Sequence, residues 1–180
     1  LAGSQTGDLA LLTAQGLLRV SSGARNDLMD VAVRPDGEAW AVGAGATLLH
    51  RIDGGWVALD AVVAPTVTLF TVTALSDGRV IYGGTGGVLR VLNPDGGVDK
   101  PDLFEANGTT LIQGQTLNKD LRRIRQVGGT VWAVGSRGAL LREAANGWHV
   151  VNNPGTNTDH WLDLAGNDAG VIWVTGEGAQ

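Results

Sequence analysis

Trp40-Ala41-Val42-Gly43 is the stretch that decides the fold, because it recurs along the chain. It returns unchanged as Trp132-Ala133-Val134-Gly135, and in looser form as Ile81-Tyr82-Gly83-Gly84 and Trp173-Val174-Thr175-Gly176. Successive copies start 41, 51 and 41 residues apart. A repeat of about 41 residues is typical of one four-stranded β-propeller blade. The sequence therefore predicts an all-β fold made of propeller blades.

The residues around each copy of this marker repeat as well. An alternating apolar stretch with a turn comes before it, as in Val31-Ala32-Val33-Arg34-Pro35-Asp36-Gly37, and a second turn such as Asp53-Gly54-Gly55-Trp56 follows it. Asp-Gly and Gly-Gly are typical of two-residue hairpin turns, because these turns need positive φ. Each repeat is thus expected to form four short antiparallel strands, with the marker in the second.

The repeat divides the chain into one domain of blades, residues 1–180. Complete blades are predicted at about 29–60, 69–98 and 121–152, partial blades at 7–28 and 161–176, and an insertion at 99–120. Leu9–Arg19 matches the pattern of Val134–Arg142, so the first partial blade is expected to begin at a second strand. Because the last partial blade ends after a second strand, we expect an incomplete propeller, a segment of a larger ring.

Composition excludes several classes of function. The net charge of −5 argues against a nucleic-acid partner, which normally requires a basic surface. The absence of cysteine excludes disulfides and thiolate zinc sites. No apolar run reaches the roughly 18 residues of a membrane span, so membrane insertion is not expected. No cofactor and no metal site are predicted.

Tryptophan is concentrated in the repeats, with six copies in the chain. Large aromatic side chains in strands that lie between blades are expected to pack in the core. The alternative is that some of them form platforms for a ligand. The tryptophans assigned a structural role are Trp40, Trp56, Trp132, Trp148 and Trp173.

The whole pattern resembles the bacterial propeller repeats of the photosystem II stability/assembly-factor type, and is similar to degenerate BNR, or Asp-box, repeats of sialidase-like propellers. A full Asp-box reads Ser/Thr-x-Asp-x-Gly-x-Thr-Trp. Here Asp53-Gly54-Gly55-Trp56 keeps the Asp, Gly and Trp at compressed spacing, and Ala145-Asn146-Gly147-Trp148 lacks the Asp. Because such repeats occur in large surface and secreted bacterial proteins, the resemblance implies a secreted, periplasmic or cell-surface location.

The sequence offers no convincing catalytic set. A sialidase-like site needs three arginines from different blades, a Tyr nucleophile and carboxylates. The only tyrosine, Tyr82, lies in a marker strand and is expected to be packed. His50, His149 and His160 stand alone without metal-ligand spacing, and the acidic run Asp95, Asp99 and Asp102 favours a solvated turn over a calcium site. We therefore predict a non-enzymatic binding or assembly module. A carbohydrate-active enzyme and a structural spacer repeat are the alternatives.

The insertion after Asp99 indicates where binding is expected. It lengthens the connection from one blade to the next, which shares a face with the turns between second and third strands. In repeat proteins such insertions often mark the binding face, although a tolerated surface loop is the alternative. The partner is predicted to be another protein or the remaining blades of the same protein. The candidate binding residues are Asp99, Asp102, Glu105, Asn107, Arg123, Arg137, Asp159 and His160.

Overall fold

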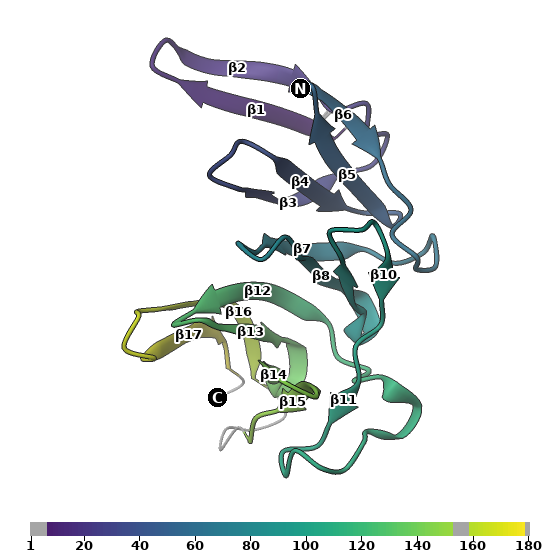
Figure 1. The fold of residues 1–180 in the computed structure, drawn as a ribbon, viewed down its shortest axis with the longest axis vertical. Coiled ribbons are helices and arrows are strands. Elements are labelled where there is room, and N and C mark those ends of the chain that lie inside the picture. Colours follow the sequence, from purple (N-terminus) through teal and green to yellow (C-terminus); the bar gives the residue numbers. More distant parts are fainter. Residues whose placement is uncertain (1–6, 153–158, 179–180) are drawn as a thin grey trace.

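The computed structural model describes residues 7–152 and 159–178 and shows an all-β chain whose sheets follow one another in an arc (Figure 1). Three sheets have the order of propeller blades, with sequence-adjacent strands paired antiparallel. Their strands are β3 (Leu28–Val33), β4 (Ala39–Gly43), β5 (Thr47–Ile52) and β6 (Gly55–Ala58); β7 (Leu69–Ala74), β8 (Val80–Gly84), β9 (Leu89–Leu92) and β10 (Val98–Asp99); and β12 (Leu121–Val127), β13 (Thr130–Gly135), β14 (Leu140–Ala144) and β15 (Gly147–Val150). The predicted propeller-type fold is confirmed.

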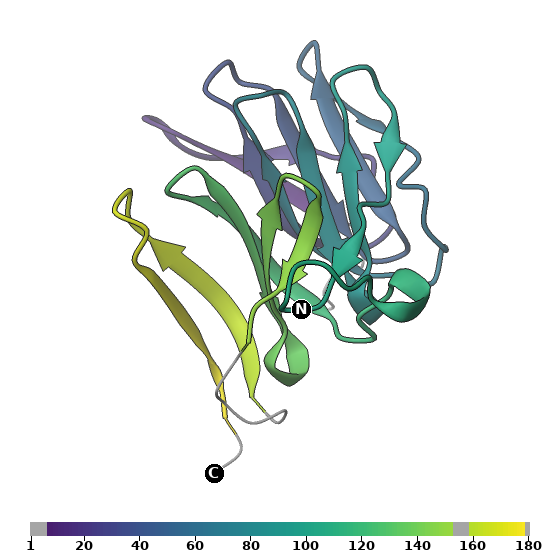
Figure 2. The same ribbon diagram turned by 60° about the horizontal axis from the view of Figure 1, so that its bottom comes forward.

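A two-stranded hairpin lies at each end of the arc. The first pairs β1 (Asp8–Thr13) with β2 (Gly16–Ser21), and the second pairs β16 (His160–Gly166) with β17 (Ile172–Glu177). Over the described residues the sheets do not close into a ring (Figure 1). Turned by 60°, the structure shows the sheets as successive layers with β16–β17 on one outer side (Figure 2). The prediction of an incomplete propeller is therefore confirmed.

The marker copies occupy equivalent positions, each in the second strand of its sheet or hairpin. Every residue of β4 and β8 is buried, as expected for a strand covered on both faces. Trp173 differs from the expectation of a packed tryptophan, because its side chain is 73% exposed. It projects from the last hairpin, beyond which the described residues provide no further sheet.

Each marker copy ends in a glycine because a larger residue would clash there. A Cβ on Gly43, Gly84, Gly135 or Gly176 would lie 1.8–2.1 Å from the carbonyl oxygen of a residue at the start of the first strand of the same sheet. These glycines do not need positive φ; they are required because two backbones approach closely. The same approach accompanies a β-bulge at the start of β3, β7, β12 and β16.

The core lies between sheets, as blade stacking requires. One apolar cluster joins β3–β6 to β7–β10 through Trp40, Val72 and Tyr82, and another joins β7–β10 to the β12–β15 sheet through Ile81, Ile124 and other side chains. A smaller cluster seats β16–β17 on β13 and β12. The first strands β3, β7, β12 and β16 contact one another in series. Within the described residues, no helix is long and apolar enough to cross a membrane.

Candidate functional site

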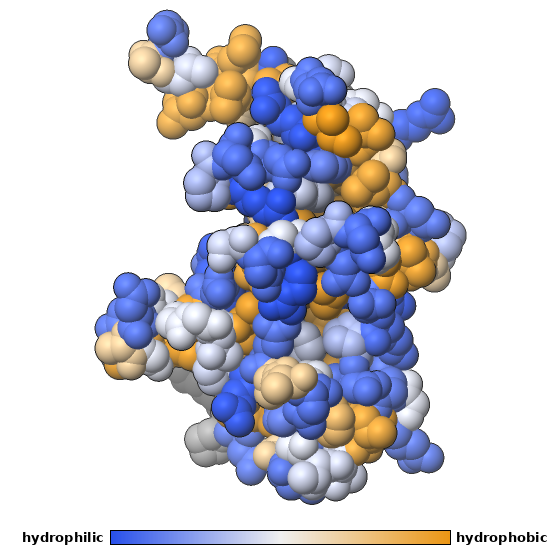
Figure 3. Space-filling view, in the orientation of Figure 1, coloured by the Kyte–Doolittle hydropathy of each residue, from blue (hydrophilic) through white to orange (hydrophobic). Residues whose placement is uncertain are grey.

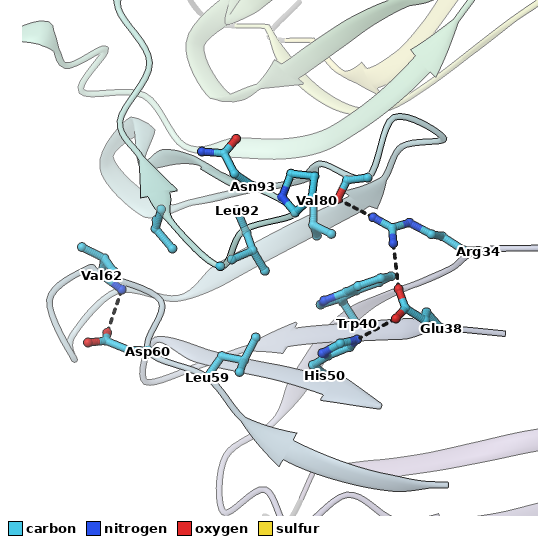
Figure 4. A pocket seen from close by; sticks show the side chains of 14 residues that line it. Arg34, Glu38, Trp40, His50, Leu59, Asp60, Val62, Val80, Leu92 and Asn93 are labelled. Atoms are coloured by element: carbon cyan, nitrogen blue, oxygen red, sulfur yellow. Dashed lines mark hydrogen bonds and ion pairs between the residues drawn. The ribbon is translucent and has the colours of Figure 1, made fainter. Parts of the chain in front are cut away.

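A pocket of about 580 Å³ lies between the sheets β3–β6 and β7–β10 (Figure 4). One wall is apolar and comes from both sheets and from the connection between them. It is formed by Leu59, Val62, Val80, Leu92, Pro94 and Val98. An apolar wall beside a few oriented polar groups is the usual composition of a ligand site.

The polar end of this pocket is formed by three stacked side chains and a carboxylate that contacts two of them. The rings of Trp40 and His50 are parallel, with centroids 4.6 Å apart, and the Arg34 guanidinium lies 4.5 Å from the centre of the Trp40 ring. Glu38 accepts a hydrogen bond from Arg34 at 2.7 Å and approaches His50 Nε2 at 3.9 Å. These contacts orient the Arg34 cation and the Glu38 carboxylate at the rim of the pocket (Figure 4).

Strand pairing explains why these residues meet. Trp40 and His50 are directly opposite each other in the β4–β5 ladder, and Arg34 and Glu38 lie in the turn between β3 and β4. Arg34 also donates to the Gly78 carbonyl of the next sheet at 2.5 Å, so it ties the two walls together. In the sequence, His50 is recognisable only as an isolated strand histidine. Aligning the second and third strands of the repeat would have placed it beside Trp40.

A second polar cluster joins the innermost strands. Arg123 on β12 lies 3.0 Å from Asp30 on β3 and 3.1 Å from Asp163 on β16, while Arg125 lies 3.4 Å from Asp163. Asp30, Thr71, Arg123 and Asp163 each follow the bulge of their own strand, so they are equivalent positions in four consecutive repeats. Arg123 is among the binding residues predicted from the sequence, but its equivalence to the other three is not visible in the repeat pattern, because the bulges appear only in the structure.

The Asp163 carboxylate of this cluster is not suited to act as a general acid. Partial burial by itself would raise the pKa of Asp163, but the hydrogen bond from the Leu164 N–H and the charges of Arg123 and Arg125 outweigh it, so the pKa is lowered. A glycosidase acid requires a raised pKa. Tyr82, whose burial raises its pKa to about 12, donates to the Ala61 carbonyl at 2.8 Å and lies in the core. It therefore cannot serve as a nucleophile in this structure.

The insertion covers the outer edge of the β12–β15 sheet. Its strand β11 (Leu103–Phe104) pairs in parallel with β15 and adds a fifth strand to that sheet. Nearby, the Gly108 carbonyl accepts from Asn146, and Asn107 accepts from the N–H groups of Thr109 and Thr110 within the loop. Much of the insertion therefore has a structural role, since an unpaired strand edge invites aggregation.

The structure gathers the predicted binding residues only in part. Asp99 and Asp102 line a cavity of about 400 Å³ together with the Arg79–Glu143 ion pair. Glu105 and Asn107 lie in the loop beyond β11, whereas Arg123 belongs to the innermost strand. Arg137 lies in the turn between β13 and β14. This turn lies next to the start of β16, because the N–H of Gly138 donates a hydrogen bond to the Asp159 carbonyl at 2.7 Å. His160 is the next residue in the chain after Asp159. The eight residues therefore do not form one site.

A metal role finds no support in the arrangement. Among residues 7–152 and 159–178, no group of three or more His, Asp or Glu side chains is placed to hold a metal ion. Asp99 accepts a hydrogen bond from the Asn93 side chain at 2.7 Å. Asp95 accepts one from the Gly97 N–H within its own turn.

The sheets and their order define the chain as β-propeller blades. It aligns over 99% of its length with a solved structure of YCF48 bound to a D1 peptide, with a TM-score of 0.60 and 17% sequence identity. The aligned part is 60% of that chain, so the protein spans less than two thirds of the structure it matches. At the level of the fold, this confirms the resemblance to propellers of the photosystem II assembly-factor type. No protein-family model and no curated protein sequence matches the chain.

Proposed function

We propose that this chain is a non-enzymatic module of a larger propeller protein and binds a segment of another polypeptide in the pocket between β3–β6 and β7–β10. The observation that carries the proposal is the pocket itself, in which an apolar wall lies beside the oriented Arg34, Glu38 and Trp40 side chains. Trp and Arg are enriched at the energetic centres of protein interfaces. A structure with the same fold has been solved with a bound peptide, which supports this class of ligand.

The ligand chemistry follows from the two ends of the pocket. Leu59, Val62 and Leu92 would surround an apolar side chain, while Arg34 and Glu38 would hydrogen-bond the main chain or polar groups that flank it. Binding of this kind needs no reactive group, in keeping with the lowered pKa of Asp163 and the buried Tyr82. A secreted, periplasmic or cell-surface location stays a prediction from the resemblance.

Selection from a phage-displayed random peptide library tests the proposal. Peptides enriched on the protein are expected to bind in isothermal titration calorimetry, and Val62→Glu is expected to weaken them at least tenfold because it places a charge in the apolar wall. Val57→Glu is the matched control, since Val57 is similarly exposed on β6 outside the pocket. Failure to enrich any peptide, or equal loss in both variants, would overturn the assignment. Turnover of a fluorogenic sialoside would favour the carbohydrate-active alternative instead.

A further inference from the structure

Unpartnered nitrogen atoms are concentrated in the pocket between β3–β6 and β7–β10. Among residues 7–152 and 159–178, four side-chain nitrogen atoms are buried without a hydrogen-bond partner. Three of them, Arg34 Nε, Trp40 Nε1 and His50 Nε2, belong to residues that line this pocket. Folded proteins pair nearly all buried polar groups, because an unpaired group has lost its hydration without compensation. Their concentration in one pocket is typical of a site built for a ligand that supplies hydrogen-bond acceptors.

The indole N–H of Trp40 differs from the other two groups. Arg34 uses its remaining nitrogens to donate to Glu38 at 2.7 Å and to the Gly78 carbonyl at 2.5 Å, and His50 Nε2 has a Glu38 oxygen 3.9 Å away. The nitrogen of Trp40 is its only polar side-chain atom, and it can only donate. Because this side chain is 3% exposed, the N–H is already dehydrated in the free protein. An acceptor that reaches it therefore adds a hydrogen bond with little further loss of hydration.

The Trp40 ring does not act as a stacking platform for a ligand. Figure 4 shows Arg34 and His50 on opposite sides of the ring. The Arg34 guanidinium lies 4.5 Å from its centre, and the centroids of the Trp40 and His50 rings are 4.6 Å apart. Both faces are thus occupied, so a ligand meets the edge of the indole, which carries the nitrogen.

The charges of the pocket favour a neutral acceptor over an anion. Besides His50, its ionisable lining residues are Arg34, Glu38 and Asp60. The Arg34 cation is already paired with Glu38, and Asp60 adds a second carboxylate. The lining therefore offers a ligand carboxylate no surplus of positive charge. The carbonyl of an amide accepts a hydrogen bond without carrying a net charge.

One wall of the pocket holds strain that allows it to move. Val62, in the connection from β6 to β7, has a φ of 51°, which β-branched residues rarely adopt. The turn is held by a hydrogen bond from the Val62 N–H to Asp60 at 2.8 Å. Figure 3 shows hydrophobic surface over this connection at the right edge of the molecule. Backbone strain of this kind is concentrated at ligand sites, and its release lets the wall move aside to admit a ligand to Trp40.

We propose that the Trp40 indole N–H donates a hydrogen bond to a neutral amide carbonyl of the ligand, while the adjoining apolar group of the ligand packs on Leu59, Val62 and Leu92. This inference rests on the proposed function, which places a polypeptide segment in the same pocket, and it names the group that the pocket recognises. A main-chain carbonyl and the side chain of Asn or Gln both supply this chemistry. Trp40 is thus the residue that determines specificity at the polar end.

Nuclear magnetic resonance tests the hydrogen bond without a selected peptide. The chain contains six tryptophans, so isotope labelling gives six indole N–H resonances, and Trp40→Phe identifies that of Trp40 by its disappearance. Titration with N-acetylleucine methylamide, a neutral amide with one apolar side chain, should move the Trp40 proton downfield in a saturable way. The resonance of Trp132, which lies outside this pocket, should stay in place. An unmoved Trp40 resonance, or equal movement of all the resonances, would overturn the inference.

N-acetylleucine is the matched control ligand, because at neutral pH it carries a carboxylate where the methylamide has a second amide. It should shift the Trp40 resonance only at higher concentration than N-acetylleucine methylamide does. Tighter binding of the anion would overturn the choice of a neutral acceptor.

Peptides enriched on the protein test the same bond in the proposed ligand. Trp40→Phe keeps a buried aromatic ring but lacks the N–H, and it should weaken these peptides about tenfold. Trp40→3-benzothienylalanine, which has sulfur in place of the N–H and keeps the shape of the indole, should weaken them equally and so excludes a loss of volume as the cause. Trp132→Phe is the matched control and should bind as the unmodified protein does.

Changes in the peptide identify the carbonyl. An ester is a weaker acceptor than an amide, so ester replacement of the recognised main-chain amide should weaken binding to the unmodified protein but not to Trp40→Phe. If Asn→Ala or Gln→Ala in the peptide shows this coupling instead, the side-chain amide is the recognised group. Equal affinity of a peptide for the unmodified protein and both Trp40 variants would overturn this inference and leave the proposed function standing. Failure to enrich any peptide, with a saturable shift of Trp40 by N-acetylleucine methylamide, would overturn the proposed function and support the amide site.

Discussion

The carboxylate of Asp30 and the guanidinium of Arg123 lie 3.0 Å apart, although a whole sheet, β7–β10, separates the sheets that carry them. The equivalent residue of the intervening sheet is Thr71, whose short side chain leaves room for the pair. Both Asp30 and Thr71 also accept an N–H from the next sheet, that of Val72 at 3.1 Å and that of Ile124 at 2.9 Å. Side chains after the bulges therefore join consecutive blades near the inner edge.

Arg123→Ala is expected to lower the free energy of unfolding by about 2 kcal/mol, as loss of hydrogen bonds between charged groups does. The substitution leaves Asp30, which is mostly buried, without its cation. Urea denaturation measures the change. Arg19→Ala is the control, because the Arg19–Asp8 pair is solvent-exposed and such pairs contribute little. Equal effects of the two variants would contradict a special role for Arg123.

Acid is expected to destabilise the fold through Asp163 and Asp77, whose pKa values are lowered. For both, desolvation would raise the pKa, but hydrogen bonds and nearby arginines outweigh it. A carboxyl with a lower pKa in the folded state contributes stability above its unfolded pKa of about 3.9 and loses it as the pH falls through the folded value. The urea concentration at the midpoint of unfolding should therefore decrease as the pH is lowered from about 5 to about 2. This range brackets the unfolded pKa by roughly 1–2 units on each side.

Asp163→Asn should reduce this acid sensitivity, because the variant has no carboxyl to protonate at that position. Asp168→Asn, at an exposed turn residue of the same hairpin, serves as the control. If both variants retained the full loss of stability in acid, Asp163 would not contribute to it.

Trp40→Ala should cost about 3–5 kcal/mol, as removal of a large buried aromatic side chain does. Trp40 is 3% exposed and packs on the next sheet. Trp173→Ala should change the stability of a single chain by less than about 1 kcal/mol, since surface substitutions have small effects. Trp132, which is half-buried against the last hairpin, should lie between them. Chemical denaturation of dilute protein checks this order, and a reversed order would contradict the burial.

Gly135→Ala should destabilise the protein by about 3 kcal/mol, the upper end of the usual cost of overpacking. Its Cβ would lie 1.8 Å from the Asp120 carbonyl oxygen, so the backbone must shift. Gly55→Ala is the control: at Gly55 the nearest atom to an added Cβ is 3.7 Å away and φ is not positive. Thermal unfolding of both variants provides the comparison, and a tolerated Gly135→Ala would show that the close approach is not required.

The sequence by itself determined the blade architecture. The interval of about 41 residues, the Asp-Gly and Gly-Gly turns and the recurring Trp-Ala-Val-Gly strand depend on local backbone preferences and on burial of alternate faces, which act within one repeat. Trp40 and Tyr82 are accordingly buried where the pattern places them.

The tertiary structure alone decided which residues meet. Asp30 and Arg123 are 93 positions apart by their numbers in the sequence, and only the stacking of three sheets brings them together. The Arg34–Trp40–His50 stack likewise needs the β4–β5 register and the Gly78 carbonyl of the next sheet. The insertion was predicted as a binding loop, but β11 pairs with β15 because an outer strand leaves backbone groups to satisfy. Contacts of this kind depend on the angle and distance between blades, which no single repeat specifies.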